Sequence, residues 1–192
     1  MVFSGAMQKL IEYVNPYAQL PPIVGTKKGA LLVIGSAAGV WDDLRRYDHR
    51  HGVQDRMVIN DMAAYYPSLY HHMVTLHPEK MGRWCFNGAA KHSHQQRAEV
   101  DYVWPLTRDG GTSGIFGVFI GLLVGYENII LAGIPCDESP RFFDPPWKKH
   151  DLFSLETAFD EWERARDTVP LFNTRVRSLS GNTRLLLGGP DD

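Results

Sequence analysis

The sequence predicts an α/β fold: a single Rossmann-like domain in which helices cover both faces of an open, mostly parallel sheet. Apolar runs without polar alternation, such as "GALLVIG", are typical of strands buried on both faces of a parallel sheet. Amphipathic helical patterns, such as "VWDDLRRYDH", separate these runs along the chain. Small or polar residues follow the strand-like runs, at the edge where open α/β sheets bind ligands.

The predicted elements alternate along the chain. Residues 1–29 form an N-terminal helix and an extended arm, and residues 30–192 form the Rossmann-like nucleotide-binding domain, with a lid loop at 137–151. Strands are expected in the segments 29–39, 56–61, 101–106, 127–134 and 174–181 and at the start of 72–84. Helices are expected at 7–14, 40–49, 114–126 and 152–169 and at the end of 72–84, with a helix or turn at 62–71. The polar segment "NGAAKHSHQQRAEV" at 87–100 is predicted to be a loop.

The composition is that of an ordinary globular protein. Hydrophobic residues make up 44% of the 192 residues and charged residues 22%, which excludes wholesale disorder. The net charge of −2 argues against a dedicated nucleic-acid binder, which carries a basic excess. Cys85 and Cys136 lack metal-ligand spacing and indicate a reducing, cytoplasmic setting. The longest apolar run, residues 115–124, is too short for a membrane span, so we expect none.

The strongest binding signal is the turn "GGTSG" at residues 110–114. Gly110 and Gly111 permit backbone angles that other residues avoid. Thr112 and Ser113 place hydroxyls at a helix N-terminus, where backbone N–H groups and the helix dipole favour an anion such as phosphate. A plain helix cap needs only one Ser or Thr and no double glycine, so the pattern favours a ligand.

The helix that follows this turn has a glycine on nearly every turn. Gly114, Gly117, Gly121 and Gly125 lie along one helical face. Each interior glycine costs up to about 1 kcal/mol of helix stability relative to alanine. We therefore expect this face to pack closely against the sheet and to hold the helix N-terminus near the ligand.

Small or polar residues at other strand ends complete a candidate nucleotide site. The full set of candidates is Gly35, Ser36, Ala37, Asn60, Asp61, Gly111, Thr112, Ser113, Gly114 and Asp137. The "GSAAG" turn either lets a ligand approach the backbone or is a tight strand-to-helix turn. Asn60 and Asp61 either contact a ribose or base or cap the helix that follows.

Two histidines follow strands at the same predicted edge and are candidate catalytic bases. His77 lies in "TLHPEK", and His150 lies in the loop "RFFDPPWKKH", whose composition suits a lid over an anionic ligand. A histidine can take up a proton near neutral pH, although an ordinary surface histidine is the plain alternative for both. No cluster of cysteines or carboxylates accompanies the histidines closely, so no metal site is predicted.

Three segments resemble a known enzyme family. "TSGIFGVFIGLLVGYENIILAGI", "LLVIGSAAGVWDDL" and "VINDM" are similar to landmarks of bacterial sialyltransferases with a single Rossmann-like domain (glycosyltransferase family forty-two). The related 6-hydroxymethylpterin diphosphokinase-like proteins share these landmarks. The resemblance implies a nucleotide held by the first turn, by Asn60 and by the turn at 112–114. It also implies that His150 is the base that deprotonates an acceptor hydroxyl.

These features make a nucleotide-dependent transferase the first functional hypothesis: a glycosyltransferase-like enzyme with a sugar-nucleotide donor and no required metal. One alternative is a Mg²⁺-dependent pyrophosphokinase-like enzyme, for which Asp61, Asp137 and Glu138 are potential ligands. Another is a protein that binds a nucleotide without catalysis. The C-terminal segment "SLSGNTR" fits either an anion-binding turn or an edge strand used in homo-oligomer contacts.

Overall fold

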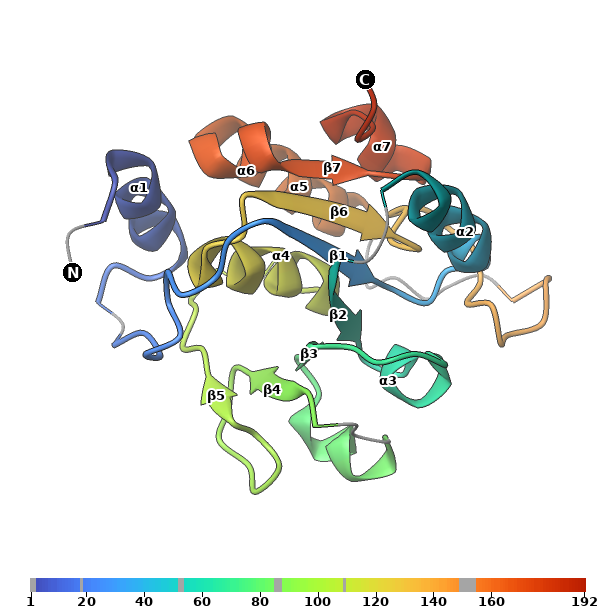
Figure 1. Ribbon diagram of the computed structural model, residues 1–192, viewed down its shortest axis with the longest axis horizontal. Coiled ribbons are helices and arrows are strands. Elements are labelled where there is room, and N and C mark those ends of the chain that lie inside the picture. The colour runs from blue at the N-terminus through green and yellow to red at the C-terminus, as the bar shows by residue number, and fades with distance from the viewer. Residues whose placement is uncertain (1–2, 18, 52–53, 85–87, 109, 149–154) are drawn as a thin grey trace.

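The computed structural model describes residues 3–17, 19–51, 54–84, 88–108, 110–148 and 155–192. In this part of the chain seven strands form one open sheet, in which every paired strand is parallel (Figure 1). The strands are β1 (Ala30–Ile34), β2 (Asp55–Ile59), β3 (His72–Thr75), β4 (Ala90–Ser93), β5 (Tyr102–Val103), β6 (Asn128–Ala132) and β7 (Val176–Ser178). Their order across the sheet is β5-β4-β3-β2-β1-β6-β7. The predicted α/β fold with a parallel sheet is confirmed.

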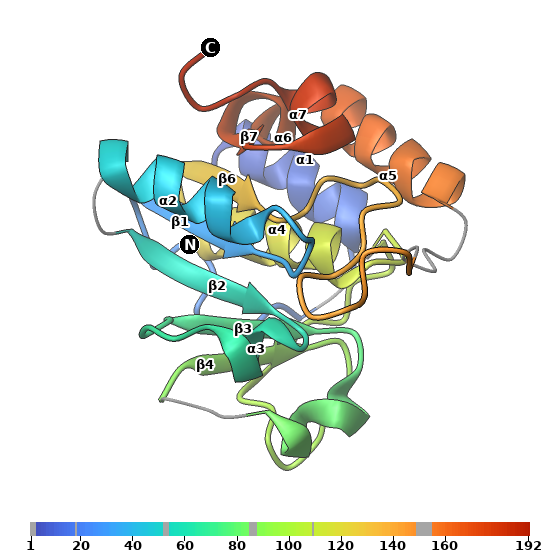
Figure 2. The same cartoon turned by 90° about the vertical axis from the view of Figure 1, so that its right-hand side faces the viewer.

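Helices cover both faces of the sheet, as predicted. On one face, α1 (Gly5–Val14), α4 (Ser113–Val124), α5 (Leu155–Thr168) and α6 (Pro170–Arg175) share a hydrophobic core with the strands. On the other face lie α2 (Val40–His51), α3 (Met62–Tyr65) and the 3₁₀ helix η1 (Pro78–Arg83). Figure 2 shows α2 in front of the sheet and α1 behind it. The last helix, α7 (Gly181–Leu187), packs beside β7.

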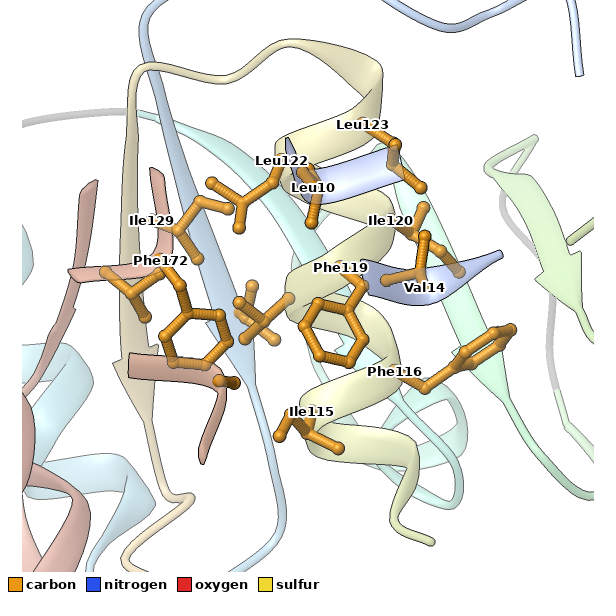
Figure 3. Close-up of a cluster of buried hydrophobic side chains, with 14 of the residues drawn as sticks. Leu10, Val14, Ile115, Phe116, Phe119, Ile120, Leu122, Leu123, Ile129 and Phe172 are labelled. Carbon is orange, nitrogen blue, oxygen red and sulfur yellow. The ribbon is translucent and has the colours of Figure 1, made fainter. Parts of the chain in front are cut away.

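Helix α4 is the centre of the larger core. All of its residues except Gly114 are buried. Leu10 and Val14 of α1 and Phe172 of α6 pack around it, with the ring of Phe172 5.8 Å from that of Phe119 (Figure 3). The N-terminal helix is therefore part of the same core as the sheet.

The glycines of α4 let the helix approach the sheet closely. A Cβ atom on Gly117 would lie 2.8 Å from Ile59 Cδ1, and one on Gly121 would lie 2.8 Å from Leu31 Cδ2. The predicted packing role is confirmed for these two residues. Gly125 has a different role, because it ends the helix with a left-handed φ of 113°.

The prediction of a loop at 87–100 was wrong for residues 90–93, because β4 runs through them between β3 and β5. Its polar side chain His92 is fully buried. Trp104 Nε1 donates a hydrogen bond to His92 Nδ1 at 3.0 Å, and His92 Nε2 lies 2.9 Å from His72 Nδ1. The polar pattern indicated solvent exposure, whereas these side chains satisfy one another inside the protein.

The C-terminal segment holds more helix than predicted. Strand β7 lies inside the expected strand at 174–181, but α6 before it and α7 after it were not predicted. Pro170 begins α6, a position where its missing N–H costs no helical hydrogen bond. This start signal was present in the sequence.

The described helices fall short of a membrane span. Helix α4 is strongly apolar but has only 12 residues, whereas a span needs about 20. In the described part of the chain, no helix combines the length and the apolar character that crossing a membrane requires.

Candidate functional site

A pocket lies where the order of the strands along the chain reverses. Strand β1 has β2 on one side and β6 on the other, so a crevice opens beyond the carboxyl ends of β1 and β6. A pocket of about 160 Å³ occupies this position. It is lined by residues that follow β1, β2 and β6, by the start of α4, and by Ala158 and Trp162 of α5. We call it the switch-point pocket.

The structure brings most of the predicted nucleotide-binding residues together in this pocket. Those that line it are Ser36, Ala37, Asn60, Thr112, Ser113, Gly114 and Asp137, whereas Gly35, Asp61 and Gly111 do not. The lining also includes Ile59, Gly133, Ile134, Pro135, Cys136 and Ser139, which were not predicted. Most of these follow β6, so the strand-end rule that selected Asp137 also points to them.

The N-terminus of α4 offers two backbone donors to the pocket. Thr112 caps the helix, because its Oγ1 accepts a hydrogen bond from Ile115 N at 3.3 Å. Ser113 Oγ accepts from Leu76 N at 3.0 Å and thereby fastens the helix to the end of β3. Among the described residues, the N–H groups of Ser113 and Gly114 have no acceptor. These free N–H groups and the helix dipole favour an anion.

Asn60 adds a side-chain donor to the pocket. Its backbone has a left-handed φ of 52°, a conformation that asparagine tolerates better than most residues. Its Oδ1 accepts a hydrogen bond from Thr75 Oγ1 at 2.7 Å, which orients the amide. Among the described residues, no acceptor lies on Nδ2, so this N–H₂ group can donate to a ligand.

Two N–H groups of the first turn are occupied within the protein. Ala37 N donates to Gly133 O at 3.2 Å, and Ala38 N donates to Pro140 O at 2.8 Å. The segments after β6 therefore occupy these two N–H groups, and the predicted contact of the turn with a nucleotide stays a prediction. Both acceptors lie far along the chain, so the sequence around the turn gave no sign of them.

Replacing Gly35 with alanine is expected to lower the free energy of unfolding by about 2 kcal/mol. A Cβ atom there would lie 2.4 Å from Gly133 O and 2.6 Å from Ile134 Cγ1, so the loops after β1 and β6 would have to separate. Urea denaturation measures the change. Gly39→Ala in the same turn is the control, because its Cβ would meet no atom within 4 Å. Equal losses in the two variants would contradict the close approach.

Residues 140–144, which we call the strap, cross the first turn. Phe142 N donates to Ser36 O at 2.9 Å. The ring of Phe142 packs edge-on against those of Trp41 and Tyr65, at centroid distances of 5.2 and 5.4 Å. This part of the predicted lid loop is therefore held against α2 and α3 in the structure.

Asp61 fastens the strap instead of lining the pocket. Its Oδ2 accepts from Arg141 Nη1 at 3.2 Å, and its Oδ1 accepts from Trp84 Nε1 at 3.1 Å. It also makes no side-chain hydrogen bond that caps α3. Asp61 therefore occupies the N-cap position of α3 without a side-chain cap, and its contact with a ribose or base stays a prediction.

The loop 133–137, which follows β6, is anchored by the segment "SLSGNTR". Thr183 Oγ1 donates to Ile134 O at 2.7 Å, and Asn182 Nδ2 donates to Cys136 O at 3.1 Å. The polar side chains of this segment therefore hold the pocket wall in place. The segment contains the end of the edge strand β7 and the start of α7, and its anion-binding and homo-oligomer roles stay predictions.

The side chains of loop 133–137 differ in what they offer a ligand. Burial, and then the charge of Asp137, raise the pKa of Cys136 to about 11, so its thiol stays protonated at neutral pH and is a poor nucleophile. Asp137 Oδ1 accepts from Ser139 N at 2.9 Å, which fixes the carboxylate at the pocket wall. A fixed carboxylate can accept hydrogen bonds from ligand hydroxyls.

Of the two predicted catalytic histidines, His77 is not brought to this pocket. The side chain of His77 is 51% exposed and lies 3.5 Å from Glu79 Oε1, and it does not line the pocket. His150 lies outside the described residues. None of the described residues that line the pocket is a histidine. In the same part of the chain, no three His, Cys, Asp or Glu side chains form a cluster suited to a metal ion.

No family model, curated protein or solved structure matches this chain, so its function is inferred from the site.

Proposed function

We propose that the protein binds a nucleotide in the switch-point pocket and uses a sugar nucleotide as the donor in a metal-independent, glycosyltransferase-like transfer. One observation carries the proposal: the N–H groups of Ser113 and Gly114 and the amide of Asn60 converge on a single pocket at the switch point of a parallel sheet. This is the position at which open α/β sheets bind nucleotides. The cytoplasmic location expected from the sequence belongs to this proposal.

The residues of the pocket divide the recognition of the donor between them. The N-terminus of α4 binds the phosphate and stabilises the negative charge that develops when the phosphate leaves. Asn60 Nδ2 donates to the ribose or the base, and the carboxylate of Asp137 accepts from a ribose hydroxyl. Charge on the leaving phosphate is offset by backbone dipoles, so this scheme requires no metal ion.

A thermal-shift screen against CMP, UMP, GMP, AMP, their diphosphates and common sugar nucleotides tests the proposal. A ligand present at a hundred times its Kd adds about 2.7 kcal/mol of stability, which raises the melting temperature by roughly 5 to 10 °C in a domain of this size. We expect such a shift without Mg²⁺. The absence of any shift would contradict nucleotide binding.

Asn60→Asp links the shift to the pocket. Aspartate tolerates the left-handed backbone and keeps an oxygen for Thr75, but it replaces the free N–H₂ donor with a negative charge. Nucleotide binding should weaken at least about tenfold. Asn128→Asp is the matched control, because Asn128 is exposed at the amino end of β6 and the change adds the same charge. Equal weakening in both variants would place the nucleotide elsewhere.

A nucleotide-binding protein without catalysis is the second candidate, and the position of His77 outside the pocket favours it. Tight nucleotide binding without turnover of any sugar nucleotide would support this alternative. A shift that appears only with Mg²⁺ and a triphosphate would instead support the pyrophosphokinase-like hypothesis.

A further inference from the structure

A second pocket adjoins the switch-point pocket on the other side of the α4 N-terminus. It has a volume of about 500 Å³ and is lined by Thr107, Arg108, Gly110, Gly111, Thr112, Thr157, Ala158 and Glu161. Thr112 and Ala158 line both pockets, so the two spaces share a wall. We call the second space the flanking pocket.

Glu161 presents an unsatisfied carboxylate oxygen in this region. Its Oε1 pairs with Arg164 and lies 3.9 Å from Arg108 Nη1. Its Oε2 is buried and, among the described residues, has no hydrogen-bond partner. A buried carboxylate oxygen is costly to leave unpaired, so the Glu161 side chain, which lines the pocket, keeps hydrogen-bonding capacity that its ion pairs do not use. Helix α5 fixes its position, because Trp162 and Ala165 anchor that helix in the core.

Arg108 is held at the same pocket by the N-terminal helix. Its guanidinium lies 5.0 Å from the centre of the Tyr13 ring, and its backbone N donates to Val14 O at 3.3 Å. Burial, and then the charge of Glu161, raise the pKa of Tyr13, which places this phenol within the field of the same carboxylate. The positive and negative side chains of the pocket are therefore both fixed by the core.

The lining selects a neutral ligand rich in hydroxyl groups. Glu161 repels an anion and Arg108 repels a cation, while together they accept and donate hydrogen bonds. The remaining lining residues are threonines, glycines and one alanine, so no large apolar side chain lines the pocket. A sugar or another polyol has the donors and acceptors that this lining complements.

We propose that the flanking pocket binds a neutral sugar acceptor and that the carboxylate of Glu161 is the base that deprotonates its hydroxyl; the inference rests on the proposed transfer from a sugar nucleotide. In that step the acceptor oxygen forms a bond to the anomeric carbon of the donor. The bond between that carbon and the phosphate oxygen breaks, and its electron pair leaves on the phosphate at the α4 N-terminus. The hydroxyl proton passes to the carboxylate of Glu161.

Ligand-observed saturation-transfer NMR with lactose and methyl α-glucoside tests the pocket without any nucleotide. The wild-type chain and Glu163→Gln, a control on the same helix whose residue does not line the pocket, should both bind a sugar. Glu161→Ala should bind it at least about tenfold more weakly. Absence of sugar binding by the wild type, or equal binding by Glu161→Ala, would overturn the proposal.

Glu161→Gln tests the base, because it keeps the size of the side chain and one acceptor oxygen. Transfer turnover should fall about 10²- to 10⁴-fold, with little change in sugar binding. Unchanged turnover would overturn the role of Glu161 as the base. A lower melting temperature in that variant would then indicate that Glu161 serves as an ion-pair partner. The nucleotide thermal shift reports only on the switch-point pocket, and its absence in the wild type would contradict the proposed function. The sugar-binding experiment tests the flanking pocket independently.

Discussion

Lowering the pH from 7 to 4 is expected to destabilise the protein steeply, because His72 and His92 are buried in uncharged form. Burial lowers the pKa of His72 to about 4, and burial together with the nearby His72 lowers the pKa of His92 to about 3. In the unfolded chain both side chains titrate near the ordinary value of about 6.5. Below that pH the unfolded chain therefore binds more protons than the folded one.

The hydrogen bonds that link these two histidines to their neighbours all run in one direction. This explains why an additional proton on either ring is unfavourable in the folded state. Trp104 Nε1 can only donate, so His92 Nδ1 is the acceptor and His92 Nε2 carries the proton. That proton is donated to His72 Nδ1 at 2.9 Å. His72 Nε2 then donates to the hydroxyl oxygen of Tyr126 at 2.9 Å, and this hydroxyl donates to Asp55 Oδ2 at 2.6 Å. A second proton on either ring would set two N–H groups against each other.

The charged groups near these hydrogen bonds do not cancel the lowering of the two histidine pKa values. Lys27 and His71 also lower the pKa of His72, whereas Asp55 raises it. Burial works to raise the pKa of Asp55, but hydrogen bonds from Tyr126 and Lys27 outweigh it and lower that pKa. Because both histidine pKa values are lower in the folded state, stability is complete above about pH 6.5 and falls as the pH drops towards 4. For each unit by which the pH falls in this range, each histidine raises the unfolding equilibrium constant by up to about tenfold.

Urea denaturation at pH 7, 6, 5 and 4, followed by tryptophan fluorescence, measures this dependence. The double variant His72→Gln/His92→Gln keeps donors and acceptors at both positions without titrating, so its stability should depend much less on pH. His49→Gln, an exposed change on α2, should leave the wild-type dependence intact. An unfolding constant that changes less than tenfold over this range in the wild type would contradict the prediction.

The same histidines show where sequence patterns reach their limit. The apolar runs at 30–34 and 128–132 predicted the central strands, because a strand buried on both faces must be apolar along its length. The segment 90–93 contains lysine, histidine and serine, a polar pattern that predicts a loop. Its burial depends on the partners of His92, which come from other strands and from a loop, and no local pattern records them.

The candidate site was predictable to the extent that strand ends define it. Asn60 and Asp137 line the switch-point pocket because parallel strands bring their carboxyl ends to one edge. The occupation of the Ala38 N–H by Pro140 was not predictable, because it depends on how the strap folds back over the first turn. Glu161 was not predicted either, since a single carboxylate on an amphipathic helix looks like a solvated side chain until its surroundings are known.

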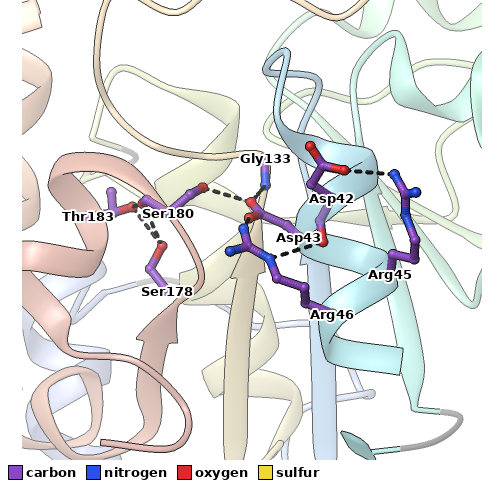
Figure 4. A network of polar contacts seen from close by, with 8 residues as sticks. All are labelled: Asp42, Asp43, Arg45, Arg46, Gly133, Ser178, Ser180 and Thr183. Carbon is purple, nitrogen blue, oxygen red and sulfur yellow. Dashed lines mark hydrogen bonds and ion pairs between the residues drawn. The ribbon is translucent and has the colours of Figure 1, made fainter. Parts of the chain in front are cut away.

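Asp43→Ala is expected to lower the free energy of unfolding by about 3 kcal/mol or more. The carboxylate of Asp43 is 1% exposed and joins three parts of the fold (Figure 4). Its Oδ2 accepts from Gly133 N at 3.0 Å and from Ser180 Oγ at 2.7 Å, and its Oδ1 accepts from Arg46 Nη2 at 3.1 Å. Alanine would leave the Gly133 N–H buried without an acceptor and would free the loops after β6 and β7 from α2.

The neighbouring residue on α2 is a matched control for this prediction. The side chain of Asp42 is 71% exposed. The one side-chain contact that Figure 4 draws for it is the ion pair with the exposed Arg45. Asp42→Ala removes the same charge one residue away and should change stability by less than about 1 kcal/mol. Asp43→Asn, which keeps one acceptor oxygen but loses the charge, should lie between the two. Urea denaturation measures the stability of the variants, and equal stability of Asp42→Ala and Asp43→Ala would contradict a role for Asp43 in holding the wall of the switch-point pocket. A much less stable Asp43→Ala that also binds a nucleotide more weakly would show that the pocket depends on this buried carboxylate.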